Sequence, residues 1–424
     1  MVSTRLLFMA ASLAPLALFA CGEPPPLDEP EPEPECREHL DCRDRMTPYC
    51  HSAKQECEPM PAAYHIGWGH NDPDAAAFEL VYQAPDGMEA MDADFRTGTN
   101  ELWIAIRYPL PRRSCTRQDE AADACRQLGG KVAVLRNAMS RRGRTEVLAD
   151  PNAWHFMRLP TSLVFGEGDF FATCGEARTC NFDDERSDFC GPTLWTAEES
   201  VFAKHFPGLN GAHMDMLHES PWCMGMVHEE HNVYWAFNGR DGSIDRYDFA
   251  ADHGPGESEH SDGMVMRYLN GELSRTPGVP SQMVIDHESR RLYVADSGNG
   301  RILRLDMDSG RPGANLSTTN FDELQVRHHV DESRWEIFPV EEGALTKPSG
   351  VLLVDDVLYV ADHRYAEISA FDLDGNLLRR LPTDFPPDSL GTLTLGPDDQ
   401  IYITLPREGQ VFRLHYDPLY FPED

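Results

Sequence analysis

Runs of about six residues that alternate between apolar and polar positions, or are apolar throughout, recur along the chain. RLYVAD at 291–296 and VLYVAD at 357–362 are nearly identical, and QIYITL at 400–405 follows the same pattern. Such runs, bounded by turns of Gly, Asp, Asn or Pro, predict β-strands. Because one short strand cannot bury its own apolar face, the recurrence predicts an array of units that pack on one another.

Six units can be recognised along residues 64–424, each with an innermost strand, an aromatic second strand and two further strands. An array of this kind avoids a long free edge when it closes into a ring. We therefore expect the last strands, at 400–416, to share a sheet with residues 78–84. The aromatic residues of the second strands are expected to pack between units, and they are Trp103, Phe171, Tyr234, Tyr293, Tyr359 and Tyr402.

The clearest units, at 280–310 and 347–375, resemble NHL repeats. Units of that family read P-x-G before an apolar strand, then Y-V-A-D-S-G-N, then R-I, and PSGVLLV and LYVADSGNGRI follow this order. The resemblance is strong for 280–375, good from there to the C-terminus and weaker for 78–200. It implies an all-β fold, a six-bladed β-propeller, for residues 64–424.

Residues 1–20 have the organisation of a secretory signal, with Arg5, the apolar stretch LLFMAASLAPLALF and small Ala20 before Cys21. The run LFAC at 18–21 resembles the lipobox of bacterial lipoproteins, which implies cleavage before Cys21 and acylation of that residue. An ordinary signal peptide followed by a structural cysteine is the alternative. By resemblance to the Gram-negative sorting rule, Gly22 implies an outer-membrane lipoprotein in the bacterial cell envelope, facing the periplasm or the cell surface.

Two short segments separate this anchor from the repeats. Residues 21–35 are a Pro/Glu run with nothing to bury, so we expect a stiff spacer that reaches roughly 43 Å. Residues 36–59 are too short for a hydrophobic core, so we expect disulfides to hold this module, with zinc binding as the alternative. Its cysteines, whose pairing stays open among three connectivities, are Cys36, Cys42, Cys50 and Cys57.

Six further cysteines lie in the first three units. With Cys21 lipidated, ten of the eleven cysteines remain, an even number that suits disulfides in an oxidising compartment. We expect these six to staple loops rather than to act as catalytic thiols. The expected pairs are Cys115 with Cys125, Cys174 with Cys180, and Cys190 with Cys223.

The formal net charge of −34 argues against a nucleic-acid partner. The sequence also contains no GxSxG elbow, P-loop, HExxH motif or dinucleotide fingerprint in the required context. Histidines with nearby carboxylates are therefore the remaining candidates for chemistry, and they suit a divalent metal such as zinc, copper or calcium.

The main metal candidate lies in the third unit. In an up-and-down blade, the turn after the innermost strand and the loop before the outer strand lie on one face. Four histidines are therefore expected to converge there with a carboxylate such as Asp252 or Asp262, and they are His228, His231, His253 and His260. A second candidate, expected on the opposite face, is His213 with Asp215 and His218. The alternative is that all of these are surface histidines or core histidines.

Two enzyme families share the propeller fold. Resemblance to peptidylglycine-amidating lyase would imply zinc-binding histidines where the innermost strands begin. Those positions hold other residues instead, namely Met91, Thr161, Cys223, Gln282, Ser349 and Leu390. Resemblance to the gluconolactonases would imply calcium in the channel, to which Glu89, Asp92 and Asp94 could contribute.

These observations predict a cell-envelope lipoprotein whose propeller is a binding or scaffolding module for a protein or a small molecule. A metal-dependent hydrolase or lyase that uses a propeller face is the alternative. Enzymatic activity stays open, because one fold serves many functions.

Overall fold

The computed structural model describes residues 49–51, 55–58, 62–67, 71–85, 87–109, 129–140, 143–178, 189–257, 259–317 and 324–416. The chain divides into two compact units, Met1–Pro59 and Met60–Asp424. In the first unit, β1 (Tyr49–His51) pairs antiparallel with β2 (Glu56–Glu58), and Cys50 lies opposite Cys57. Both of these cysteines are disulfide-bonded.

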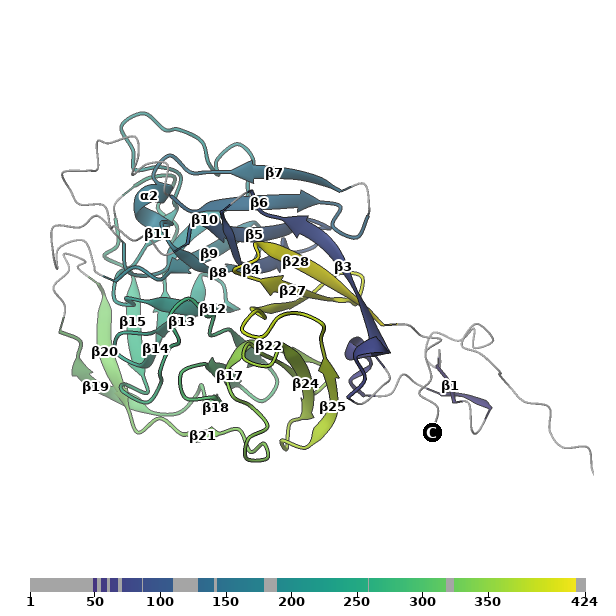
Figure 1. Cartoon of the computed structure of the whole chain (residues 1–424). Coiled ribbons are helices and arrows are strands. Elements are labelled where there is room, and N and C mark those ends of the chain that lie inside the picture. Colours follow the sequence, from purple (N-terminus) through teal and green to yellow (C-terminus); the bar gives the residue numbers. More distant parts are fainter. Residues whose placement is uncertain are drawn as a thin grey trace, which may run out of the picture. The chain divides into compact units, whose positions relative to one another are not determined.

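The second unit is a six-bladed β-propeller (Figure 1). Each innermost strand packs against the innermost strands of the neighbouring blades, so the six sheets stand around one axis. Strands are given from the axis outwards: the first blade has β4 (Glu89–Phe95), β5 (Leu102–Arg107), β6 (Lys131–Arg136) and β7 (Arg144–Leu148), and the second has β8 (Pro160–Phe165), β9 (Phe170–Gly175), β10 (Thr193–Thr196) and β11 (Asp215–Met216). The third blade has β12 (Cys223–Glu230), β13 (Val233–Asn238), β14 (Ser243–Asp248) and β15 (Met264–Tyr268), and the fourth has β16 (Met283–Asp286), β17 (Arg291–Asp296), β18 (Arg301–Asp306) and β21 (Trp335–Ile337). The fifth blade has β22 (Pro348–Val354), β23 (Val357–Asp362), β24 (Glu367–Asp372) and β25 (Leu377–Pro382), and the sixth has β26 (Leu393–Leu395), β27 (Ile401–Leu405), β28 (Gln410–Tyr416) and β3 (Ala76–Gln83).

The ring closes as the sequence predicts. The sixth blade takes its outermost strand, β3, from the start of the propeller, and β3 runs antiparallel to β28 from Ala76–Tyr416 to Gln83–Gln410. Figure 1 shows this seam as the dark β3 beside the yellow β28. Because the two ends of the domain share one sheet, neither end can separate without breaking a β-ladder.

An insertion in the fourth blade lengthens the third. Between β18 and β21 the chain forms a hairpin of β19 (Arg311–Asn315) and β20 (Val326–Asp331). Strand β20 pairs in parallel with β15, the outer strand of the third blade, which therefore belongs to a sheet of six strands. The regular repeat did not predict this extension, because the hairpin pairs with a neighbouring blade and not with its own.

The six second-strand aromatics are buried between blades, as predicted. Each is at most 2% exposed. Trp103 of the first blade, for example, packs against Phe165 and Phe171 of the second, with ring centroids 5.5 and 5.2 Å apart. Six apolar clusters of this kind fill the spaces around the ring. Burial of apolar surface between neighbours is thus the main force that holds the blades together.

A short strap precedes β3. Its 3₁₀ turn η2 (Tyr64–Ile66) buries His65, whose Nδ1 lies 2.9 Å from the hydroxyl of Tyr359 in the fifth blade. A second turn, η3 (Pro73–Ala75), leads into β3, and a single-turn helix, α2 (Ala153–Phe156), joins the first blade to the second. Within the described part of the chain, no helix combines the length and the apolar character needed to cross a membrane.

Two of the predicted disulfide pairs are wrong. Cys174, in β9 of the second blade, is bonded to Cys223, the first residue of β12 in the third, with Cα atoms 5.8 Å apart. The predicted pairs Cys174–Cys180 and Cys190–Cys223 are therefore excluded. The sequence favoured short loops, but the ring brings the two strands together across 49 residues of chain. Cys190 is disulfide-bonded too.

Candidate functional site

Polar side chains form hydrogen bonds that link the innermost strands of neighbouring blades. Asp92 of β4 accepts hydrogen bonds from the hydroxyl of Ser162 (2.8 Å) and the backbone N–H of Leu163 (3.0 Å), both in β8. On the other side of the ring, Oε1 of Gln282 accepts from the N–H groups of Val351 and Leu393, both at 2.9 Å. One glutamine amide thus ties together the fourth, fifth and sixth blades.

The positions that would hold zinc ligands in the lyase family also serve these links. The hydroxyl of Thr161 donates to the carbonyl of Cys223 at 2.6 Å, and that of Ser349 lies 3.0 Å from the carbonyl of Leu390. These groups stabilise the ring by satisfying backbone carbonyls of the next blade.

Asp92 and Asp94 are two of the three carboxylates that the sequence offered as calcium ligands, the third being Glu89. Burial raises the pKa of Asp92 to about 6 and that of Asp94 to about 7, whereas hydrogen bonds from the backbone N–H groups of β8 oppose the shift. One oxygen of Asp94 accepts from the N–H of Phe165 at 2.8 Å. Both carboxylates are therefore engaged in the contact between the first two blades.

A network of buried ions lies on the face of the ring where the innermost strands begin, which we call the front face. Arg107, at the end of β5, is 1% exposed. Its Nε donates to Glu89 at 2.8 Å and its Nη1 to Glu176, just after β9, at 3.2 Å. Glu176 is itself 4% exposed. Buried ions of this kind are stable only when each charge has a partner.

The network continues to the third blade. Glu176 also accepts from Nη1 of Arg275, and from the backbone N–H of Gly278 at 3.1 Å. The guanidinium of Arg275 lies 4.3 Å from the ring centroid of Trp222, a cation–π contact. The two cysteines of the Cys174–Cys223 disulfide are close to this network in sequence, since Cys174 precedes Glu176 by two residues and Cys223 follows Trp222. Sequence reasoning missed this network, because its members come from separate strands and connections and match no motif.

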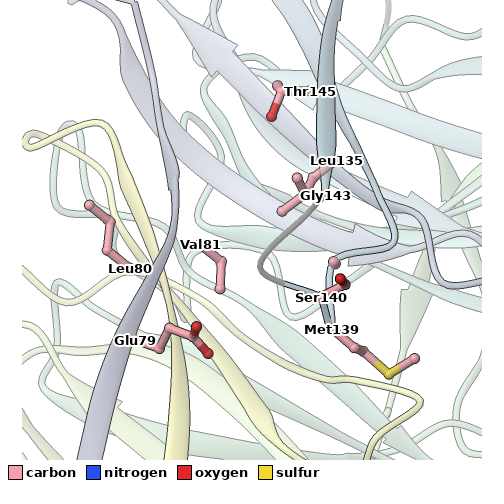
Figure 2. Close-up of a pocket in the computed structure, with 9 residues that line it drawn as sticks. Glu79, Leu80, Val81, Leu135, Met139, Ser140, Gly143 and Thr145 are labelled. Carbon is pink, nitrogen blue, oxygen red and sulfur yellow. The ribbon is translucent and has the colours of Figure 1, made fainter.

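A cavity of about 220 Å³ lies between β3 and the turn from β6 to β7, where the sixth blade meets the first; Figure 2 shows the residues that line it. Leu80 (48% exposed) and Thr145 are among the residues that line it. The carboxylate of Glu79, also in the lining, lies 2.7 Å from Nε2 of His415 and 3.6 Å from Nη1 of Arg413. This carboxylate therefore belongs to the pairing of β3 with β28.

The four histidines of the main metal candidate do not form one cluster within the described residues. Nε2 of His228 contacts the carbonyl of His231 at 2.9 Å, and Nδ1 of His231 lies 3.2 Å from Glu167. Burial lowers the pKa of His228. The strand directions were predicted correctly. However, the side chains of His228 and His231 turn towards the second blade, where His231 contacts Glu167. The loop at 249–263 instead carries His253 and His260 to Asp215 of β11.

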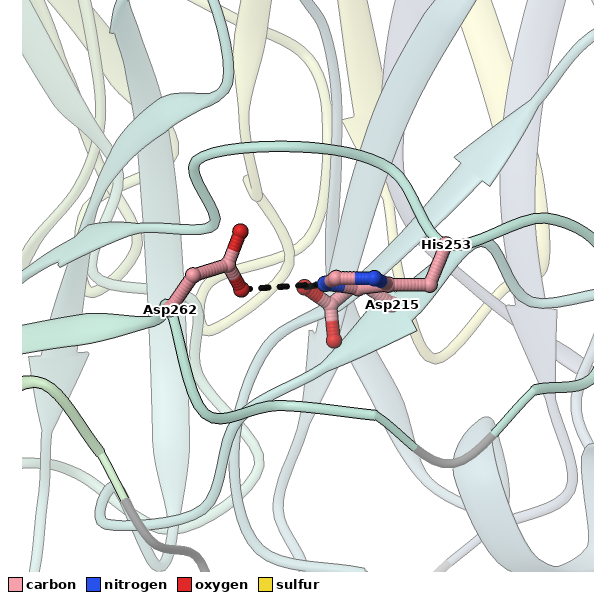
Figure 3. A group of neighbouring side chains, drawn as sticks. All are labelled: Asp215, His253 and Asp262. Atoms are coloured by element: carbon pink, nitrogen blue, oxygen red, sulfur yellow. Dashed lines mark hydrogen bonds and ion pairs between the residues drawn. The ribbon is translucent and has the colours of Figure 1, made fainter.

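The loop histidines meet Asp215, which the sequence assigned to the other candidate. Nε2 of His253 lies 2.9 Å from Oδ1 of Asp262 and 3.9 Å from Oδ2 of Asp215. Nδ1 of His260 lies 3.0 Å from Oδ1 of Asp215. Figure 3 shows the carboxylates of Asp215 and Asp262 near the tip of the His253 ring, with a dashed line for the contact between His253 and Asp262. Burial raises the pKa of Asp215, and the hydrogen bond from His260 opposes that shift.

The remaining members of the second candidate are not ligands of this group. Nδ1 and Nε2 of His213 face the backbone carbonyls of Asn210 (2.9 Å) and Glu257 (3.0 Å), and burial lowers its pKa to about 4. His213 thus lies against the same loop, and the expectation that it enters the opposite face is wrong. His218 is buried against Phe189, with ring centroids 4.5 Å apart, and Asp252 is exposed.

Several predicted site residues lie outside the described residues, and, apart from the excluded pair Cys174–Cys180, what was predicted for them stays a prediction. They are Cys21, Cys36, Cys42, Cys115, Cys125 and Cys180.

The chain matches no family model, and no curated protein matches it in sequence. Among solved structures, an auxiliary nutrient binding protein from Bacteroides thetaiotaomicron aligns with 77% of this chain and 69% of its own at 11% identity and a TM-score of 0.48. A second one, from Bacteroides ovatus, aligns with 82% and 75% at 11% identity and a TM-score of 0.47. Virginiamycin B lyase from Staphylococcus aureus, an inactive variant with quinupristin, aligns with 80% and 99% at 10% identity and a TM-score of 0.44. These values carry no conclusion about function. The class of protein follows from the strand topology itself, which is that of a six-bladed β-propeller.

Proposed function

We propose that this protein is a lipoprotein of the bacterial cell envelope whose NHL-type propeller acts as a binding module. The anchor is Cys21, acylated after cleavage of residues 1–20, and the Pro/Glu spacer holds the propeller away from the membrane. The cysteine-rich module at 36–59 connects the spacer to the ring.

The front-face ion network is the observation that carries the binding role. Arg107, Glu176 and Arg275 hold the rims of three blades in one arrangement beside the channel, and Trp222 supplies an aromatic surface there. Strands β5 and β9, which precede the inserted segments 108–130 and 176–192 in sequence, both end on this same face. Loops carried by a rigid scaffold are the usual site of recognition. The ligand is a protein or a small molecule.

The alternative function is a metal-dependent hydrolase or lyase. The polar groups at the starts of the innermost strands favour the binding role, because Thr161, Gln282 and Ser349 are used in cross-blade hydrogen bonds. A catalytic group must instead be able to reach a substrate.

Two measurements test the proposal. Cys21→Ser should leave the precursor unprocessed or release the protein from membranes, which fatty-acid labelling and detergent partitioning detect. Unchanged labelling and partitioning would contradict the lipid anchor.

The binding role is tested with a panel of lactones, esters and envelope-derived small molecules, read by both thermal shift and turnover. We expect a compound that stabilises the wild type but not Arg275→Ala, without being consumed, while Arg311→Ala on the surface behaves as wild type. Turnover of a lactone or ester would favour the enzymatic alternative.

A further inference from the structure

Three potential ligand atoms from two blades converge on the back face of the ring, where the innermost strands end. They belong to Asp215 at the start of β11 and to His253 and Asp262 in the loop between β14 and β15, and all lie within 4.8 Å of one another. Asp215 is 1% exposed, and its Oδ2 has no hydrogen-bond partner. A buried carboxylate oxygen without a partner is costly, so its presence points to a ligand.

We propose that Asp215, His253 and Asp262 bind a divalent metal ion, with zinc as the first candidate. The bound ion would fasten the loop at 249–263 to β11. This inference is independent of the proposed binding role, since the cluster lies on the face opposite the ion network. The site it describes differs from the four-histidine site that the sequence suggested.

The spacing of the ligand atoms fits such an ion. In a tetrahedral zinc site with bonds of about 2.0–2.1 Å, neighbouring ligand atoms are about 3.3 Å apart. The separations from Nε2 of His253 are 2.9 Å to Asp262 and 3.9 Å to Asp215, which bracket that value. One imidazole with two carboxylates is a ligand set suited to zinc, and it leaves a fourth position for water.

The proton balance is simple. The contact between His253 and Asp262 at 2.9 Å needs one proton on Nε2 or on the carboxylate. Metal binding displaces that proton, so the imidazole nitrogen and the carboxylate oxygen both become ligands. The proton moves to Nδ1 when the imidazole is neutral, and it is released to solvent when His253 is an imidazolium or Asp262 is protonated.

His260 has the geometry of a positioning residue. Its Nδ1 lies 3.0 Å from Oδ1 of Asp215, and the N–H of Met216 donates to the same oxygen at 2.6 Å. These two contacts fix the carboxylate so that Oδ2 is left to face His253. Outer-shell partners of this kind orient metal ligands and raise metal affinity.

The loop itself is held in the conformation that the site needs. The N–H of His253 donates to the carbonyl of Met214 at 3.2 Å, and the N–H of Gly256 to that of His213 at 2.7 Å. Gly256 has a φ of +75°, and a Cβ there would lie 2.7 Å from the carbonyl oxygen of Gly211. Only glycine fits this close approach, so the backbone presents His253 to β11 before any ion binds.

The test is a zinc titration of the detergent-solubilised full-length protein after treatment with a chelator, read by calorimetry and by metal analysis. We expect the wild type to bind one more zinc ion per chain than Asp215→Asn or His253→Gln, and to gain melting temperature with zinc that these variants do not gain. His231→Gln is the matched control, because His231 is exposed and contacts Glu167 outside the cluster, and it should bind as the wild type does.

His260→Gln separates positioning from coordination. It should keep the stoichiometry of the wild type and lower the zinc affinity by about 10- to 100-fold, the range seen for outer-shell partners. Equal zinc content in the wild type, Asp215→Asn and His253→Gln would overturn the proposal. Because the wild-type titration stands by itself, a wild type that binds no zinc would overturn it even if one of the variants failed to fold.

Discussion

Replacement of Arg107 by methionine should destabilise the propeller far more than the same replacement on the surface. The change keeps the apolar stem but removes the charge that Glu89 and Glu176 share. Glu176 is 4% exposed and cannot recover by hydration. Removal of one partner from a buried ion pair costs about 3–5 kcal/mol. We expect the lower end, about 3 kcal/mol, because Glu176 keeps Arg275 and the N–H of Gly278.

The magnitude can be converted into a melting temperature. For the unit Met60–Asp424, an unfolding entropy of about 2.1 cal/mol/K per residue gives roughly 0.8 kcal/mol/K, so that a loss of 3 kcal/mol lowers the melting temperature by about 4 °C. Calorimetry measures this shift, and urea unfolding checks the free energy.

Arg311→Met is the control, because Arg311 pairs with Glu332 at 2.9 Å while both side chains are mostly exposed. Exposed pairs contribute about 0–1 kcal/mol, so this variant should melt close to the wild type. A loss in Arg107→Met no larger than that in Arg311→Met would show that the buried network does not hold the blades. A double-mutant cycle of Arg107→Met with Glu176→Gln would then measure the interaction energy between these two side chains directly.

Two further predictions concern the links between blades. Replacement of both Cys174 and Cys223 by serine should lower the free energy of unfolding by about 4 kcal/mol, since the bond closes a loop of 49 residues. Non-reducing peptide mapping of the wild type should recover this pair, and a peptide joining Cys190 to Cys223 would contradict it. Deletion of residues 400–416 should abolish cooperative unfolding of the whole propeller, because β3 loses its partner β28 and the sixth blade loses its core. A truncated monomer that still unfolds in one sharp transition would count against a closed ring.

The regular part of the fold could be predicted from the sequence because each unit repeats the same local physics. Period-two strands, turn residues and one aromatic per unit locate the six second strands, and the need to hide sheet edges predicts the pairing of β3 with β28. The hairpin of β19 and β20 could not be predicted in this way. Its pairing with β15 depends on how far the insertion reaches around the ring, which strand periodicity does not encode.

The candidate sites show the same division. Strand direction placed the loop of His253 and His260 on the correct face, but the direction of each side chain decides which groups meet. His228 and His231 turn towards Glu167, and Asp215, 38 residues before His253 in sequence, completes the cluster instead. The front-face network of Arg107, Glu176 and Arg275 carries no sequence signal, because its members are ordinary charged residues until the ring brings them together.

The first three blades depart most from the regular repeat of the chain, and they carry covalent and ionic links across their junctions. The second and third blades are joined by the Cys174–Cys223 disulfide on the front and by the Asp215–His260 contact on the back. In blades four to six, whose first three strands stay closest to the repeat although the hairpin of β19 and β20 follows β18, one neutral side chain, that of Gln282, serves three strands. A blade with long insertions interrupts the strand pattern on which interblade packing depends, so stronger point contacts compensate for less regular burial. By this reasoning, the charged and disulfide-bonded residues of blades one to three keep the ring rigid where its loops depart most from the repeat.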